Sequence, residues 1–153
     1  MTLKVKFRRL HPDAVIPTKA HPHDAAFDLT ATSVRYDRTN RATIYGTGLA
    51  FDIPKGHAMF IYPRSSSFRH SALMFNSVAV IDSGYHGEVH IVMKGLKCEY
   101  TAGERIAQAI IMPIPDTVYE ETDEEFEDSE RGTGGLGSTG TAPINPYTNG
   151  RNG

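Results

Sequence analysis

Short apolar runs separated by turn residues dominate the chain up to residue 114. Residues 3–7 alternate apolar and polar side chains, as expected of a half-buried strand. Similar runs rich in Val, Ile, Tyr and Phe follow at residues 42–53, 57–63, 73–82, 87–95 and 105–114. Turn residues such as Pro54, Gly84 and Gly103 lie between them. The pattern predicts an all-β domain of sandwich, jelly-roll or barrel type, with at most one short helix near residues 65–71.

The C-terminal part of the chain has a different composition. Residues 120–130 hold eight of the 18 acidic residues and no Lys or Arg. Residues 131–153 hold seven of the 14 glycines and have no helical or strand period. We therefore expect a β domain over residues 1–118, an acidic linker over 119–130 and a flexible glycine-rich arm over 131–153.

The overall charge limits the classes of ligand and partner that the chain is expected to bind. The chain of 153 residues has a net charge of −2, which does not favour direct binding to nucleic acid. Outside the acidic run the chain has 16 basic and 10 acidic residues, and this excess of positive charge favours an anionic ligand. The single cysteine, Cys98, cannot close an internal disulfide, and no apolar run approaches the roughly 18 residues of a membrane span. We expect a reducing intracellular compartment such as the cytoplasm, or the nucleus in a eukaryote, and no membrane partner.

Two segments combine polar side chains with apolar strands. Asp28 and Gln108 each lie inside an apolar run, where a polar side chain needs a partner, either structural or within a site. Arg64, Ser65 and Ser66 follow another apolar run. There, a guanidinium and two hydroxyls could contact phosphate, or the serines could simply cap a turn.

Two further segments suggest nucleotide chemistry. Asp82 ends an apolar run at a predicted hairpin, where its carboxylate could activate a water or cap the turn. Tyr85 follows and could be a stacking surface or part of a half-buried strand. Residues 131–140 begin with Arg131 and are rich in glycine and hydroxyl groups, a composition that suits phosphate oxygens but also a flexible linker.

Taken in order, five segments resemble the five motifs of the homotrimeric dUTP pyrophosphatases (dUTPases). They are residues 25–29, 63–66, 80–89, 103–108 and 131–140, with the sequences AAFDL, PRSS, VIDSGYHGEV, GERIAQ and RGTGGLGSTG. The resemblance implies a jelly-roll or distorted β-barrel fold and a homotrimer with three shared active sites. It also implies Mg²⁺ and a C-terminal arm that closes over the substrate. The implied reaction is hydrolysis of dUTP to dUMP and pyrophosphate by water attack on the α-phosphorus, which keeps uracil out of DNA and supplies dUMP for dTMP synthesis.

The same resemblance implies a role for each matching residue. Asp82 would activate the water, and Asp28 would orient the waters of the phosphate-bound Mg²⁺. Tyr85 would pack under the deoxyribose and exclude a 2′-hydroxyl, and Asn76 would help the hairpin to read uracil. The α- and β-phosphates would be bound by Arg64, Ser65, Ser66 and Gln108. The γ-phosphate would be bound by Arg131, Ser138 and Thr139 of the arm.

The arm departs from the usual pattern of this family at the residue that covers the base. Leu136, followed by Gly137, stands where an aromatic residue usually stacks on uracil. Leucine can cover a base by apolar contact, at a loss of about 1–3 kcal/mol of stacking, unless Tyr147 or Phe126 supplies a ring.

Two alternatives share the fold. A dCTP deaminase would need a carboxylate on the strand after the hairpin, where this chain has Val92, and Tyr85 stands where deaminases tend to have Trp. A dUTP-sensing regulatory protein would use the trimer as a platform for an unknown protein partner. An assay of pyrophosphate and ammonia release separates these functions.

Overall fold

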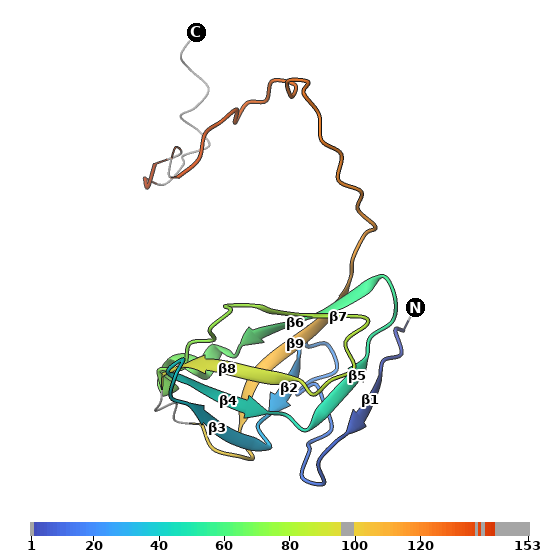
Figure 1. Ribbon diagram of the computed structural model, residues 1–153, viewed down its shortest axis with the longest axis vertical. Helices are drawn as coiled ribbons and strands as arrows, with labels where there is room; N and C mark the ends of the chain where they lie inside the picture. Colours follow the sequence, from blue (N-terminus) through green and yellow to red (C-terminus); the bar gives the residue numbers. More distant parts are fainter. Residues whose placement is uncertain (1, 96–99, 137, 139, 143–153) are drawn as a thin grey trace. The chain divides into compact units, whose positions relative to one another are not determined.

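The structure is a computed structural model that describes residues 2–95, 100–136, 138 and 140–142. Residues Met1–Thr117 form one compact unit and Val118–Gly153 a second. The elements are β1 (Lys6–Arg9), β2 (Phe27–Thr30), β3 (Ser33–Asp37), β4 (Ala42–Gly46), β5 (Leu49–Asp52), β6 (His57–Pro63), the 3₁₀ helix η1 (Ser65–His70), β7 (Ala79–Asp82), β8 (His90–Lys94) and β9 (Arg105–Pro113). The strands make three antiparallel sheets, β1-β5, β2-β9-β6-β7 and β3-β4-β8 (Figure 1). The all-β prediction is confirmed.

The core joins the three-stranded and the four-stranded sheets. Leu29, Met59 and Ile106 from the four-stranded sheet are fully buried, in one apolar cluster with Tyr45 and Ile91 of the three-stranded sheet. Burying a large apolar side chain contributes about 1.5–3 kcal/mol, so this cluster is the main source of stability. It leaves the opposite face of the four-stranded sheet free to carry polar residues.

A glycine corner divides the apolar run 42–53 into two strands of different sheets. Gly48 has φ of +65°, and a Cβ there would lie 2.9 Å from the Cβ of Ala14. Only glycine adopts this backbone conformation freely and leaves that space open. β4 therefore ends at Gly46 and β5 begins at Leu49, a division that strand periodicity alone did not predict.

Some elements differ from the sequence-based expectation. The expected half-buried strand at residues 3–7 is wrong in position and exposure, because β1 starts at Lys6 and all four of its side chains are exposed. Among the described residues, β1 pairs with β5 alone, in a two-stranded sheet. β3 was not expected, because it has no apolar run in the sequence. In the structure only its Val34 and Asp37 are half-buried.

The short helix expected near residues 65–71 is confirmed as η1, which has six residues. Within the described part of the chain, no helix has the length and apolar character needed to cross a membrane.

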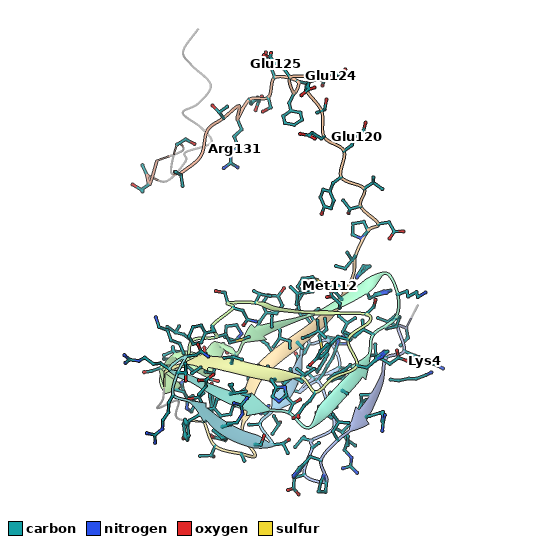
Figure 2. The ribbon with its side chains drawn as sticks, viewed as in Figure 1. Lys4, Met112, Glu120, Glu124, Glu125 and Arg131 are labelled. Carbon is teal, nitrogen blue, oxygen red and sulfur yellow. The ribbon has the colours of Figure 1, made fainter. Side chains whose placement is uncertain are left out.

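The second unit has no strand or helix among its described residues. Figure 2 shows Glu120, Glu124 and Glu125 along an extended stretch, with their side chains directed away from its backbone. Residues 118–130 are exposed throughout, as expected of a segment in which like charges repel one another.

Candidate active site

A row of side chains crosses the outer face of the four-stranded sheet. Asp28 in β2 lies directly opposite Gln108 in β9, and Gln108 lies opposite Tyr62 in β6. Directly opposed residues of antiparallel strands point to the same face. The neighbouring Leu29 and Ala107 are fully buried in the core, so the row faces outward. The structure thus brings together the two polar residues that the sequence placed inside apolar strands.

The Asp28 carboxylate is held between two guanidinium groups. Arg64 Nε donates to Asp28 Oδ1 and Arg105 Nη1 donates to Asp28 Oδ2, each at 2.8 Å. The Asp28 and Arg64 side chains are only 19% and 23% exposed, so water screens this pair less than a surface pair. Within this cluster two guanidinium groups contact one carboxylate, which leaves N–H donors to spare for an anionic ligand.

Arg105 is a site residue that the sequence analysis missed. It is the first residue of β9, and its pairing with Thr30 follows a register shift between Leu29 and Thr30. An arginine at the start of a strand looks like ordinary surface in a sequence. The available signal was its place in residues 103–108, three positions before Gln108.

Residues at the end of β6 and just after it orient the Arg64 side chain and the amide of Gln108. Arg64 precedes η1 in an extended conformation, and its Nη1 donates to Ser66 Oγ at 3.4 Å and to the Arg105 carbonyl at 3.3 Å. Gln108 Nε2 donates to the carbonyl oxygen of Pro63 at 2.9 Å. These contacts fix Arg64 at the end of β6, next to Ser65.

An open cavity of about 620 Å³ lies over this cluster. Its walls include Asp24, Asp28, Arg64, Ser65, Arg105 and Gln108. The volume is in the range of small-molecule sites, and three of the four residues predicted to bind the α- and β-phosphates, Arg64, Ser65 and Gln108, line it. Ser66 joins them through its contact with Arg64.

The hairpin predicted within residues 80–89 is wrong, because β7 pairs with β6 and β8 pairs with β4, in different sheets. The loop that joins β7 to β8 carries a second cluster of side chains. Asp82 is the last residue of β7 and is exposed, and its carbonyl oxygen accepts the Tyr85 N–H at 3.1 Å. The Tyr85 ring is 45% exposed, and its hydroxyl donates to the carbonyl oxygen of Glu88 at 2.9 Å. Asp82, Tyr85 and Glu88 line one small cavity of about 240 Å³.

Asn76 lies in the turn that leads into β7. Its predecessor Phe75 donates its N–H to the Val92 carbonyl at 2.9 Å, and its successor Ser77 has φ of +53°. The Asn76 carbonyl accepts the N–H of Val78, so the backbone turns tightly at this position. The Asn76 side chain is exposed, three residues before the start of β7.

The two clusters are well separated within one chain. Asp82 lies opposite Ala58, four residues along β6 from Tyr62, or about 13 Å at the rise of a strand. β7 and β2 are the two edges of the four-stranded sheet, about 14 Å apart. The Asp82 and Asp28 backbones are therefore about 19 Å apart, and Asp82 does not line the cavity of Arg64.

The arm contains the remaining predicted residues. Gly137, Thr139 and Tyr147 lie outside the described residues. Arg131 Nε donates to the Gly134 carbonyl at 3.2 Å, and Gly134 N–H donates to the Arg131 carbonyl at 3.0 Å, which makes a local turn. Leu136 has φ of +42° and is fully exposed, Phe126 is 88% exposed, and Ser138 is exposed. Figure 2 shows Arg131 at the start of this segment.

The described residues do not form a direct metal site. None of their His, Cys, Asp and Glu side chains gather in groups of three that could hold an ion. Mg²⁺ commonly keeps several waters and uses one or two carboxylates together with substrate phosphates. Each Asp28 oxygen accepts one guanidinium N–H and has a lone pair left for a metal-bound water. The donor set therefore fits an ion held mainly by phosphates and water.

Known proteins resemble this chain over most of its length. The sequence model of the dUTPase family matches residues 13–140. A deoxyuridine 5′-triphosphate nucleotidohydrolase of Thermobifida fusca (strain YX) is 41% identical over 145 residues, which cover 91% of this chain and 80% of the relative.

The fold of this chain resembles the folds of solved dUTPase structures. A mutant dUTPase of Staphylococcus bacteriophage 80alpha with dUpNHpp is 25% identical and has a TM-score of 0.78, covering 92% of this chain and 100% of that one. A mutant dUTPase from phage phi11 of S. aureus, which coordinates a structural Mg(II) ion, is 22% identical, with a TM-score of 0.66 and 80% and 98% coverage. The expected jelly-roll fold is confirmed by this likeness, and with the family match the chain belongs to the dUTPase family.

Proposed function

We propose that the protein hydrolyses dUTP to dUMP and pyrophosphate. The observation that carries the proposal is the cavity of Asp28, Arg64 and Arg105 in a chain of the dUTPase family. It offers several guanidinium and amide donors in one place, which a triphosphate needs. The reaction would remove dUTP before its use in DNA synthesis and would supply dUMP for dTMP synthesis.

The cavity lined by Asp28, Arg64 and Arg105 binds the phosphates of the substrate. Arg64, Ser65, Ser66 and Gln108 bind the α- and β-phosphates, and Asp28 keeps both guanidinium groups in place. This assignment is supported by the 2.8 Å contacts of Arg64 and Arg105 with Asp28. The pair of fixed positive charges needs little reorganisation when the substrate arrives.

Asp82 is the general base of the proposal. Its carboxylate takes a proton from a water whose oxygen attacks the α-phosphorus. The bond from that phosphorus to the bridging oxygen breaks, and pyrophosphate leaves with that oxygen. The exposed position of Asp82 at the end of β7 supports this role, because the group is accessible to substrate and water.

The active site is shared between copies of the chain in a homotrimer. In one chain the base lies about 19 Å from the phosphate cavity, longer than one nucleotide can span within a single site. Between the two clusters, Phe60, Val80 and Ile110 lie side by side on the outer face, and Val80 is 55% exposed. This apolar face would be covered by a neighbouring subunit that brings its Asp82 near the cavity.

The segment of residues 76–85 and the arm select the substrate. Tyr85 packs under the deoxyribose, and Asn76 helps the backbone of this segment to read uracil. A mismatched base would leave buried polar groups unpaired, which is an effective penalty. The acidic linker carries the arm, in which Arg131, Ser138 and Thr139 bind the γ-phosphate while Leu136 and Gly137 cover the base. Closure of the arm excludes water from the site.

Mg²⁺ is the proposed cofactor. When bound, it neutralises triphosphate charge and aligns the phosphates, with Asp28 accepting hydrogen bonds from its waters. The single cysteine in the sequence supports a reducing intracellular compartment as the place of action. No nucleic acid is proposed as a partner.

The test compares dUTP, dTTP, dCTP and UTP in the presence of Mg²⁺, with release of pyrophosphate and of ammonia as readouts. We expect pyrophosphate from dUTP alone, and a loss of at least about a hundredfold in kcat for Asp82→Asn. Ammonia release would favour the deaminase alternative, and binding of dUTP without turnover would favour a regulatory protein.

A further inference from the structure

The Tyr85 side chain is held through a chain of contacts that leads to the β4–β5 corner. Its hydroxyl donates to the Glu88 carbonyl oxygen at 2.9 Å. The Glu88 carboxylate in turn accepts the N–H of Gly48 through Oε1 at 2.8 Å, and its Oε2 lies 3.5 Å from His90 Nε2. The Gly48 corner packs against Ala14 of the core cluster. An exposed tyrosine is therefore linked to the rigid part of the sheet.

Two glycines leave the space that this arrangement needs. A Cβ on Gly87 would lie 2.6 Å from the hydroxyl oxygen of Tyr85 and 2.7 Å from its Cζ. A Cβ on Gly46 would lie 2.6 Å from Glu88 Oε1. Neither glycine has a positive φ, so space and not backbone conformation is what alanine would violate there. At Gly87 the side chain that must move is the Tyr85 ring itself.

We infer that Glu88 is a positioning residue which, with Gly87, fixes the Tyr85 ring and thereby sets the selection of deoxyribose over ribose. The inference rests on the proposed function, in which Tyr85 packs under the sugar. Ribose differs from deoxyribose by one hydroxyl oxygen, so a steric filter works only if the ring is held within a fraction of an ångström. The hydrogen bond to Glu88 provides that restraint, and the absence of a Cβ at Gly87 leaves the ring room to occupy this position.

The chemistry of Glu88 predicts an order among its variants. The acceptor for Tyr85 is a backbone carbonyl, so any residue at position 88 retains it. What a substitution changes is the contact with Gly48, which holds that carbonyl in place. Glu88→Gln keeps an oxygen that can accept the Gly48 N–H, whereas Glu88→Ala loses it.

The experiment measures kcat/KM for dUTP and for UTP in the full chain with Mg²⁺. We expect the ratio of UTP to dUTP turnover to rise at least about fivefold in Glu88→Ala and in Gly87→Ala, with Glu88→Gln in between. The control is Thr39→Ala in the β3–β4 turn, an exposed residue outside the proposed site. Its ratio should stay near that of the wild type.

A general loss of structure would lower turnover of both nucleotides together, whereas the inference requires a change in their ratio. An unchanged ratio in Gly87→Ala, with a native circular dichroism spectrum, overturns it even where Glu88→Ala does not fold. Failure of the wild type to hydrolyse dUTP would instead overturn the proposed function.

Discussion

At the scale of single residues, the charge balance around Asp28 determines what the cavity can bind. One carboxylate with two guanidinium partners, each at 2.8 Å, holds both arginines in fixed positions. Fixed donors bind an anion with a smaller loss of side-chain entropy than free ones. Arg105 is the more exposed of the two arginines, at 54% against 23%, so it can contact a ligand while it still contacts Asp28.

We predict that Arg105→Gln weakens substrate binding. Loss of one charge-assisted contact corresponds to about 1.5–3 kcal/mol, or a fall in kcat/KM for dUTP of roughly tenfold to a hundredfold. Steady-state kinetics check this, with Arg38→Gln as a control because Arg38 is exposed in the β3–β4 turn. Equal kinetics for the two variants would contradict a role of Arg105 in the cavity.

The sequence predicted part of this cluster for a physical reason. Asp28 and Gln108 stood out because a polar side chain in an apolar strand must find a partner. Arg105 did not stand out, because its contact with Asp28 accompanies a register shift at which the pairing of β2 with β9 skips Ile106. The cross-strand pairing that determines such contacts joins residues far apart in the chain.

At the scale of elements, the turn before β9 fixes the start of the strand that carries Arg105 and Gln108. Glu104 Oε2 accepts the Thr101 N–H at 2.6 Å and the Thr101 hydroxyl at 3.0 Å. The backbone hydrogen bond first, and then the hydroxyl, lowers the pKa of Glu104 below its ordinary value. The charged carboxylate thus closes the turn.

This turn should make a small, pH-dependent contribution to stability. Because the folded-state pKa of Glu104 is lowered, the stabilisation is present above the ordinary pKa near 4.5 and is lost as the pH falls through the folded value. We expect Glu104→Gln to have a lower Tm than the wild type at pH 7, and the difference in Tm to shrink as the pH is lowered below 4.5. Thermal unfolding over this pH range checks this, and a Tm difference that does not change with pH would contradict it.

Most strands could be predicted from apolar runs, and the exceptions have local causes. The run 42–53 looked continuous because the corner at Gly48 depends on the space beside Ala14, which no periodicity reports. β3 was hidden because its strand character comes from pairing with β4 along five residues and not from its own apolar side chains.

At the scale of the whole molecule, composition separated the body from the segment that follows it. The body is compact up to Thr117, and the described residues beyond it form neither strand nor helix. A core that lies entirely in the first unit does not need the second for its stability.

We predict that deletion of residues 131–153 abolishes most turnover of dUTP while the β body stays folded. The reason is that the deletion removes the proposed γ-phosphate ligands and no residue of the core cluster. Activity assays and near-ultraviolet circular dichroism check the two parts. Full activity of the truncated chain would contradict the role given to the arm.

The gap of about 19 Å between Asp82 and the Asp28 cavity also has a genetic consequence. Chains with Asp82→Asn and chains with Arg64→Gln are each expected to be inactive alone. Reassembled together in equal amounts, three quarters of random trimers would be mixed, and each would regain one intact site of three, or about a quarter of the wild-type rate. Complementation between two defective alleles would follow in a cell that expresses both, whereas no recovery on mixing would mean that each chain works alone.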